Sequence, residues 1–77
     1  MRTNRRSSYY VDRVTDDAVY IIDMDQGKSV TNDAENVVLD IYLEYGNRRI
    51  IYKDTDGRWD ELLHDKGTFT GFGPLNL

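Results

Sequence analysis

Two aspartate-rich stretches, DMDQG (residues 23–27) and DTDG (residues 54–57), contain the residue types that bind calcium. A calcium loop needs oxygen ligands at its first, third, fifth and twelfth positions and glycine at its sixth. With Gly57 in sixth place, Tyr52 and Leu63 occupy the first and twelfth; with Gly27 there, Met24 occupies the third. Because neither spacing fits, we expect these aspartates to form turns, and we expect no metal or other cofactor.

Catalytic chemistry is also poorly represented. His64 is the only histidine, there is no cysteine, and no serine lies in a nucleophile-elbow sequence. The glycines of TGFG lack the strand-to-helix context of a phosphate-binding loop. Adjacent carboxylates such as Asp60 and Glu61 are common on exposed strands and turns. We therefore expect a protein that is not an enzyme.

Charge is unevenly placed along the chain. Its 10 basic and 14 acidic residues give a formal charge of −4. Arg2, Arg5 and Arg6 lie in the first six residues, which leaves 7 basic against 14 acidic groups in residues 7–77 (7 − 14 = −7). Such a body repels nucleic-acid phosphates and suits a partner protein with a basic surface, although acidity also simply keeps small proteins soluble. The alternative is a regulator that contacts nucleic acid through the three arginines.

Length and composition indicate one folded domain. At 77 residues without cysteine, stability must come from packing one core. Residues 1–7 have no apolar periodicity and are predicted to be a flexible basic tail, with residues 8–77 forming the domain. No apolar run approaches the roughly 20 residues of a membrane span, and no apolar segment follows the first arginines. We expect a cytoplasmic protein without membrane contact.

The elements that position any functional residue begin with a predicted β-hairpin. Residues 9–14 and 18–25 are rich in β-branched and aromatic residues, and Thr-Asp-Asp between them favours a turn. Along the second strand, Tyr20, Ile22 and Met24 share one face, whereas the opposite face ends in two aspartates. We therefore expect the tyrosine face to pack on the core.

A helix is predicted over residues 33–45. Asn32 occupies the N-cap position, Glu35 follows at the capping-box spacing, and Gly46 can end the helix with a positive φ angle. At 100° per residue, one side of this helix forms the expected core stripe. That stripe contains Ala34, Val37, Val38, Ile41, Tyr42 and Tyr45.

Leu39 and Leu43 fall outside this stripe, one turn apart on the opposite side of the helix. Acidic residues flank them: Asp33, Asp40 and Glu44. Two explanations are open. Either the carboxy-terminal segment, with Phe69, Phe72 and Leu75, covers the leucines, or they form a contact surface for a partner protein with basic residues or for a second copy.

The rest of the chain is predicted to be a three-stranded meander. Residues 48–54 form the first strand, and Asp56-Gly57 is a hairpin signal. Residues 58–64 fit either a strand or a short helix; the turn signals on both sides favour the strand. Residues 68–72 form the last strand, ended by Gly73-Pro74. The predicted fold is therefore α+β, with one amphipathic helix packed on a mostly antiparallel sheet.

Two stretches, SVTNDAENVV (residues 29–38) and RIIYKDTDGRWDELLHDKGTFTGFGPL (residues 49–75), resemble small accessory proteins of tailed bacteriophages. This resemblance implies a protein that acts in the host cytoplasm by binding a host protein. It also implies a mode of action, in which an acidic protein inhibits a DNA-binding enzyme by imitating the charge of DNA. The sequence as a whole therefore predicts a small acidic protein-binding module.

Overall fold

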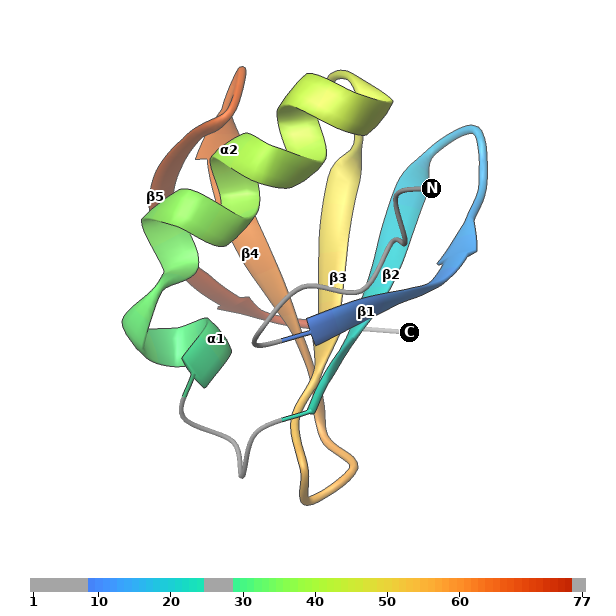
Figure 1. Ribbon diagram of the computed structural model, residues 1–77, viewed down its shortest axis with the longest axis vertical. Helices are drawn as coiled ribbons and strands as arrows, with labels where there is room; N and C mark the ends of the chain where they lie inside the picture. The colour runs from blue at the N-terminus through green and yellow to red at the C-terminus, as the bar shows by residue number, and fades with distance from the viewer. Residues whose placement is uncertain (1–8, 25–28, 76–77) are drawn as a thin grey trace, which may run out of the picture.

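The computed structural model describes residues 9–24 and 29–75 (Figure 1). Its elements in chain order are β1 (Tyr9–Val14), β2 (Ala18–Asp23), α1 (Ser29–Asn32), α2 (Ala34–Tyr45), β3 (Arg49–Lys53), β4 (Trp59–Asp65) and β5 (Thr68–Pro74). Neither helix in the described part of the chain is long and apolar enough to cross a membrane. The tail over residues 1–7 lies outside the described residues.

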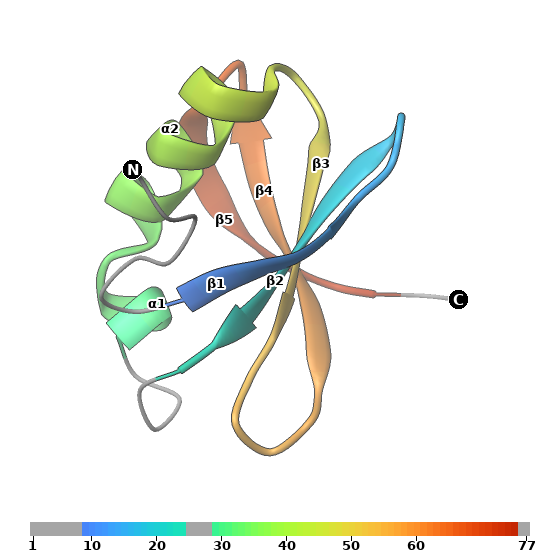
Figure 2. The ribbon, with the colours of Figure 1, turned by 45° about the vertical axis from the view of Figure 1, so that its right-hand side comes forward.

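The strands form one five-stranded sheet in the order β1-β2-β3-β4-β5. β1 and β2 pair as a hairpin, β3, β4 and β5 form an antiparallel meander, and β2 and β3 run parallel because the helical segment connects them. Figure 2 shows both helices on the same side of this sheet. The α+β prediction is confirmed.

The turn that follows residues 58–64 shows that this segment, which fitted either a strand or a helix, is a strand. Residues 66 and 67 connect the paired residues Asp65 and Thr68, and their φ angles are 51° and 92°. Positive φ at both central residues matches a tight two-residue hairpin. A Cβ on Gly67 would lie 2.7 Å from Cδ2 of Tyr42, so this turn also lies directly against α2. The strand prediction for residues 58–64 is confirmed.

The predicted end of β5 is wrong, because the strand continues through Gly73 to Pro74. β5 is an edge strand, where a proline is tolerated if its missing N–H would face away from the neighbouring strand. A bulge in the β4–β5 ladder follows Leu63, and Gly71 has a φ of 150°.

The predicted helix start is also wrong. Asn32 is the last residue of α1 instead of an N-cap, and Asp33 joins α1 to α2. Asp33 makes no side-chain cap hydrogen bond, but its carbonyl oxygen accepts one from Val37 N at 2.9 Å. The extra turn has a core residue, since Val30 is completely buried. The helix end is as predicted: Gly46 has a φ of 83°, and its N–H donates to Tyr42 O.

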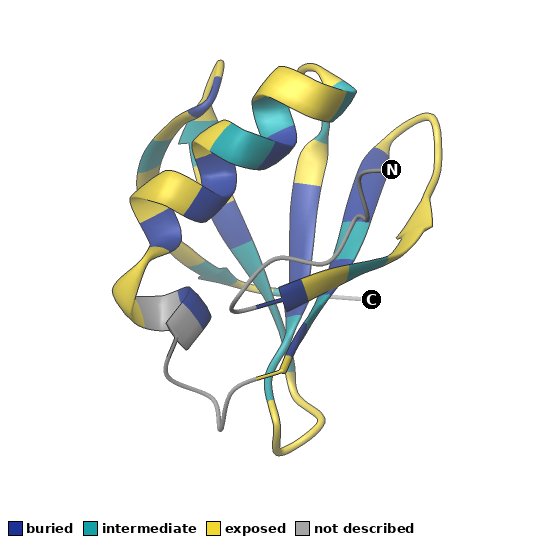
Figure 3. Ribbon diagram, in the orientation of Figure 1, coloured by how far each residue is buried: buried dark blue, intermediate teal, exposed yellow. Residues whose placement is uncertain are grey.

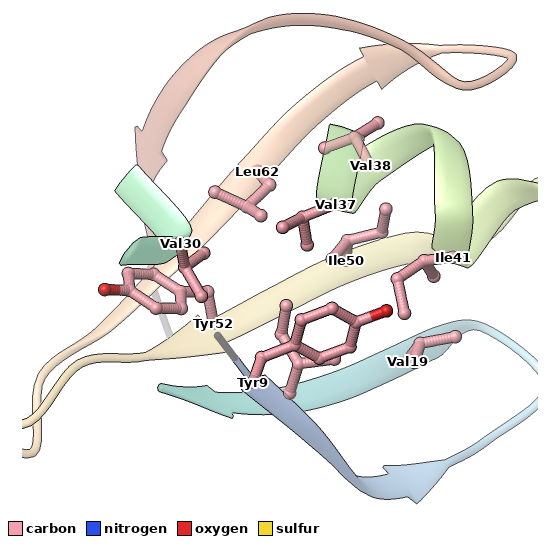
Figure 4. Close-up of a cluster of buried hydrophobic side chains, with 10 residues drawn as sticks. Tyr9, Val19, Val30, Val37, Val38, Ile41, Ile50, Tyr52 and Leu62 are labelled. Atoms are coloured by element: carbon pink, nitrogen blue, oxygen red, sulfur yellow. The ribbon is translucent and has the colours of Figure 1, made fainter. Parts of the chain in front are cut away.

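The core lies between the helices and the sheet (Figures 3 and 4). Four of the six residues of the predicted helix stripe are buried, while Tyr42 and Tyr45 are half-buried. The buried apolar cluster consists of Tyr9, Val19, Ile21, Val30, Val37, Val38, Ile41, Ile50, Tyr52 and Leu62.

The predicted core face of β2 is wrong. Val19 and Ile21 are completely buried under the helices, whereas Tyr20 and Ile22 are half-buried and Met24 is exposed. The aspartate that argued against this face, Asp23, is itself buried, and its Oδ2 accepts a hydrogen bond from the Tyr52 hydroxyl at 2.8 Å. A buried carboxylate is tolerated where hydrogen bonds replace water.

Candidate binding surfaces

The first candidate is the outer surface of α2, formed by Leu39 and Leu43 with Asp33, Asp40 and Glu44 (the helix outer surface). Leu39 is 46% exposed and Leu43 is 73% exposed. Figure 3 shows the buried side of α2 facing the sheet and exposed residues on the opposite side. The two leucines therefore face outward, as their spacing predicts.

The carboxy-terminal segment does not cover these leucines. Phe69 lies beside Leu39 along a shallow hollow of about 260 Å³, but Leu39 keeps nearly half of its surface exposed. Phe72 contacts the Phe69 ring at a centroid distance of 5.2 Å and is itself 46% exposed. Leu75 lines a different hollow, beside Trp59. Within the described residues, the structure leaves the leucines uncovered.

The acidic residues of the helix outer surface differ from one another. Asp33 and Glu44 are exposed, whereas Asp40 is half-buried. The Tyr9 hydroxyl donates a 2.6 Å hydrogen bond to Asp40 Oδ2, which ties β1 to α2. Asp40 therefore also has a structural role that its place in the sequence did not reveal.

The second candidate is the side of the sheet turned away from the helices (the open sheet face). Strand register and alternation place eleven residues of β1 to β4 there: Tyr10, Arg13, Ala18, Tyr20, Ile22, Arg49, Ile51, Lys53, Trp59, Glu61 and Leu63. Among the described residues, no helix lies on this face (Figure 2). The residues on a solvated sheet face are usually polar, but seven of these eleven are apolar or aromatic.

Aromatic and cationic side chains meet on the open sheet face. The Tyr20 and Trp59 rings contact edge to face, with centroids 5.9 Å apart. Arg13 Cζ lies 4.2 Å from the Tyr20 centroid, and Lys53 Nζ lies 5.6 Å from that of Trp59. Ile51, which pairs with Tyr20 in the register, is only 1% exposed, so the larger side chains around it exclude water. The face is a preformed apolar layer with cations above it.

One ion pair crosses the same face. Arg49 binds Glu61 through two hydrogen bonds, from Nη2 at 2.9 Å and from Nε at 3.1 Å. Hydrogen bonding to Glu61 and the attraction of its carboxylate raise the pKa of Arg49 above its already high ordinary value. Glu61 thus compensates Arg49, whereas neither Arg13 nor Lys53 makes an ion pair with any described residue.

His64 is held by the backbone on both sides of its ring. Gly67 N–H donates to Nδ1 at 2.9 Å, which requires Nδ1 to be an acceptor, so Nε2 carries the proton and donates to Arg48 O at 2.7 Å. Both nitrogens connect the turn after β4 to the start of β3. This arrangement gives His64 a structural role.

The remaining predicted site residues were Arg2, Arg5 and Arg6, which lie outside the described residues. Over residues 9–24 and 29–75, no three histidine, aspartate or glutamate side chains gather as a possible metal site. Sequence reasoning missed the open sheet face because its cations and rings come from four strands. Period-two alternation in 49–53 and 59–63, which groups Arg49 with Lys53 and Trp59 with Leu63, was the available signal.

Comparisons with protein-family models, curated proteins and solved structures found no match for this chain.

Proposed function

We propose that this chain is a non-enzymatic protein-binding module, and that the helix outer surface is its contact surface. One observation carries the proposal: Leu39 and Leu43 are 46% and 73% exposed, one turn apart on the same side of α2. Fully burying a leucine is worth about 1.5–3 kcal/mol, a large share of a small domain's stability. A partner that covers both residues would gain that contribution.

The charge around the leucines supports a partner with basic residues. Residues 33–45 contain four carboxylates and no lysine or arginine. Complementary charge around an apolar contact speeds association and selects against acidic partners. We propose such a surface, apolar at its centre and basic at its rim, as the chemistry that the module recognises.

The resemblance to phage accessory proteins extends this proposal to an inhibitor or modulator of a host protein in the host cytoplasm. An acidic surface that imitates DNA is one form of it. The capture and titration experiment described below also tests this extension, because a host target must bind the helix outer surface.

A nucleic-acid regulator is the second candidate function. The observation that favours it is the group of three arginines, Arg2, Arg5 and Arg6, within the first six residues. Contact through Arg2, Arg5 and Arg6 would be strongly salt-dependent. Deletion of residues 2–6 that abolishes such binding would favour this candidate.

The test of the proposed function replaces both leucines by serine. A tagged chain first captures candidate partners from a lysate of a bacterial host, and purified candidates are then titrated with Leu39→Ser/Leu43→Ser. We expect at least a tenfold loss of affinity and an unchanged melting temperature. The matched control is Val14→Ser/Met24→Ser, which alters two other exposed apolar residues and should bind normally.

Two results would contradict the proposal. Equal affinity of both double variants for a purified partner would show that the helix outer surface is not the contact. A large fall in the melting temperature of a chain that light scattering shows to be monomeric would show that the leucines belong to the core.

A further inference from the structure

Within the described residues, two surfaces of opposite character are exposed to solvent. The helix outer surface combines exposed leucines with carboxylates, and the open sheet face combines aromatic and aliphatic groups with cations. We infer that these two surfaces bind each other between copies, so that the helix outer surface of one copy lies on the open sheet face of the next. This inference rests on the proposed function and names the partner as a second copy of the chain.

Layer packing supports a helix as the occupant of the open sheet face. A sheet with an apolar face is ordinarily covered by another layer, and here α1 and α2 cover only one side (Figure 2). A helix on the other side would complete a helix–sheet–helix arrangement. α2 is the helix with exposed apolar residues, Leu39 and Leu43, and these would lie on the rings of Tyr20 and Trp59.

Charge complements this apolar match. On the open sheet face Glu61 compensates Arg49, which leaves Arg13 and Lys53 as two cations without an ion pair to a described residue. The facing helix of a second copy would present Asp33 and Glu35, both exposed. Cations above a preformed apolar layer therefore meet carboxylates beside a leucine pair.

The same charges argue against two other occupants. Two open sheet faces related by a two-fold axis would bring Arg13 and Lys53 of both copies together, which opposes a face-to-face dimer. A single nucleic-acid strand needs several cations and free ring faces. Here Arg13 already lies over Tyr20 and Lys53 over Trp59, and the chain carries a formal charge of −4.

The predicted contact is heterologous, because two different surfaces meet. Such contacts repeat from copy to copy until they close into a ring or extend as a filament. Only two leucines project from the helix outer surface, so each contact is small and belongs among weak, transient interfaces. Association should therefore appear only at high protein concentration.

The experiment uses two variants, each lacking one surface. Leu39→Ser/Leu43→Ser removes the helix outer surface and keeps the open sheet face. Arg13→Glu/Lys53→Glu reverses the charge of the open sheet face and keeps the helix outer surface. By sedimentation up to about 500 µM, we expect the average mass of the wild type to rise above 9.0 kDa with concentration, and each variant alone to remain at 9.0 kDa.

The mixture of the two variants provides the decisive measurement. Each variant keeps the surface that the other lacks, so an equimolar mixture should form a dimer of twice the monomer mass and stop there. Arg58→Glu/Lys66→Glu is the matched control, since it changes the net charge equally at two exposed residues outside the open sheet face. The control should associate like the wild type, and circular dichroism should show that all variants are folded.

Several outcomes would overturn the inference. A wild type that is monomeric at about 500 µM, a mixture that gives no dimer, or variants that associate like the wild type would each do so. Fluorescence anisotropy that shows oligothymidylate binding, lost in Arg13→Glu/Lys53→Glu, would identify a nucleic-acid surface instead. A monomeric wild type that still binds a foreign protein through Leu39 and Leu43 would leave the proposed function standing and this inference refuted.

Discussion

The two faces of the sheet both contain apolar residues on β2, but their surroundings differ. On β2, Val19 and Ile21 face the helices and are completely buried, while Tyr20 and Ile22 face the other side and are half-buried. Both pairs are apolar, so hydrophobicity alone does not identify the core. The helices determine which face becomes the core, and the other face is left as an apolar surface that a partner can cover.

The first prediction compares neighbouring leucines of β4. Leu62 faces the helices and is completely buried, whereas Leu63 faces the other side and is 38% exposed. Leu62→Ala removes packed methyl groups and leaves a cavity, so we expect a loss of about 2–5 kcal/mol. Leu63→Ala should cost less than about 1 kcal/mol, because water already reaches that side chain.

Urea unfolding of both variants measures this difference. The two substitutions remove the same atoms from adjacent positions, so each is a control for the other. Equal losses for Leu62→Ala and Leu63→Ala would mean that the open sheet face is as well packed as the core, and the comparison of the two faces would fail.

Local sequence signals predicted most of the fold. Turn residues such as Asp56-Gly57 and Lys66-Gly67 determine hairpins through their own backbone preferences, so the strands that they connect were predictable. Burial on β2 was not, because Asp23 depends on the Tyr52 hydroxyl, which lies 29 residues away in the chain. The α1 turn escaped prediction for the same reason: burial of Val30 is a tertiary effect.

The candidate surfaces divide in the same way. Helical spacing alone predicted the outward direction of Leu39 and Leu43, since both lie on one element. The open sheet face gathers Arg13, Tyr20, Lys53 and Trp59 from four strands, and their contacts depend on strand order and register. The proximity of these groups therefore cannot be predicted from the sequence alone, because the register of β2 with β3 is needed to place them.

The second prediction compares two tyrosines by replacing each with phenylalanine. Tyr52 is 3% exposed and donates a hydrogen bond to the buried Asp23, so Tyr52→Phe removes a donor from a buried carboxylate. We expect a loss of about 1–3 kcal/mol in urea unfolding. Tyr20→Phe keeps the ring beneath Arg13 and should change stability by less than about 0.5 kcal/mol. A larger effect for Tyr20 than for Tyr52 would reverse the proposed roles of the two faces.

The smallest predicted effect concerns the ion pair on the open sheet face. The Arg49 side chain is 56% exposed, so solvent screens its attraction to Glu61, and Glu61→Gln should cost less than about 1 kcal/mol. About 1 M NaCl should reduce that cost further.

The pKa of Arg49 is raised in the folded chain, so the pair's contribution is present below the unfolded pKa of arginine and is lost only as pH rises through the higher folded value. Both values lie far above neutrality. Thermal melts of the wild type and Glu61→Gln should therefore differ by the same small amount at about pH 6 and about pH 9. A difference that grows across this interval would show that Glu61 is coupled to another titrating group, and the open sheet face would then hold a more strongly interacting charge network than its exposed geometry implies.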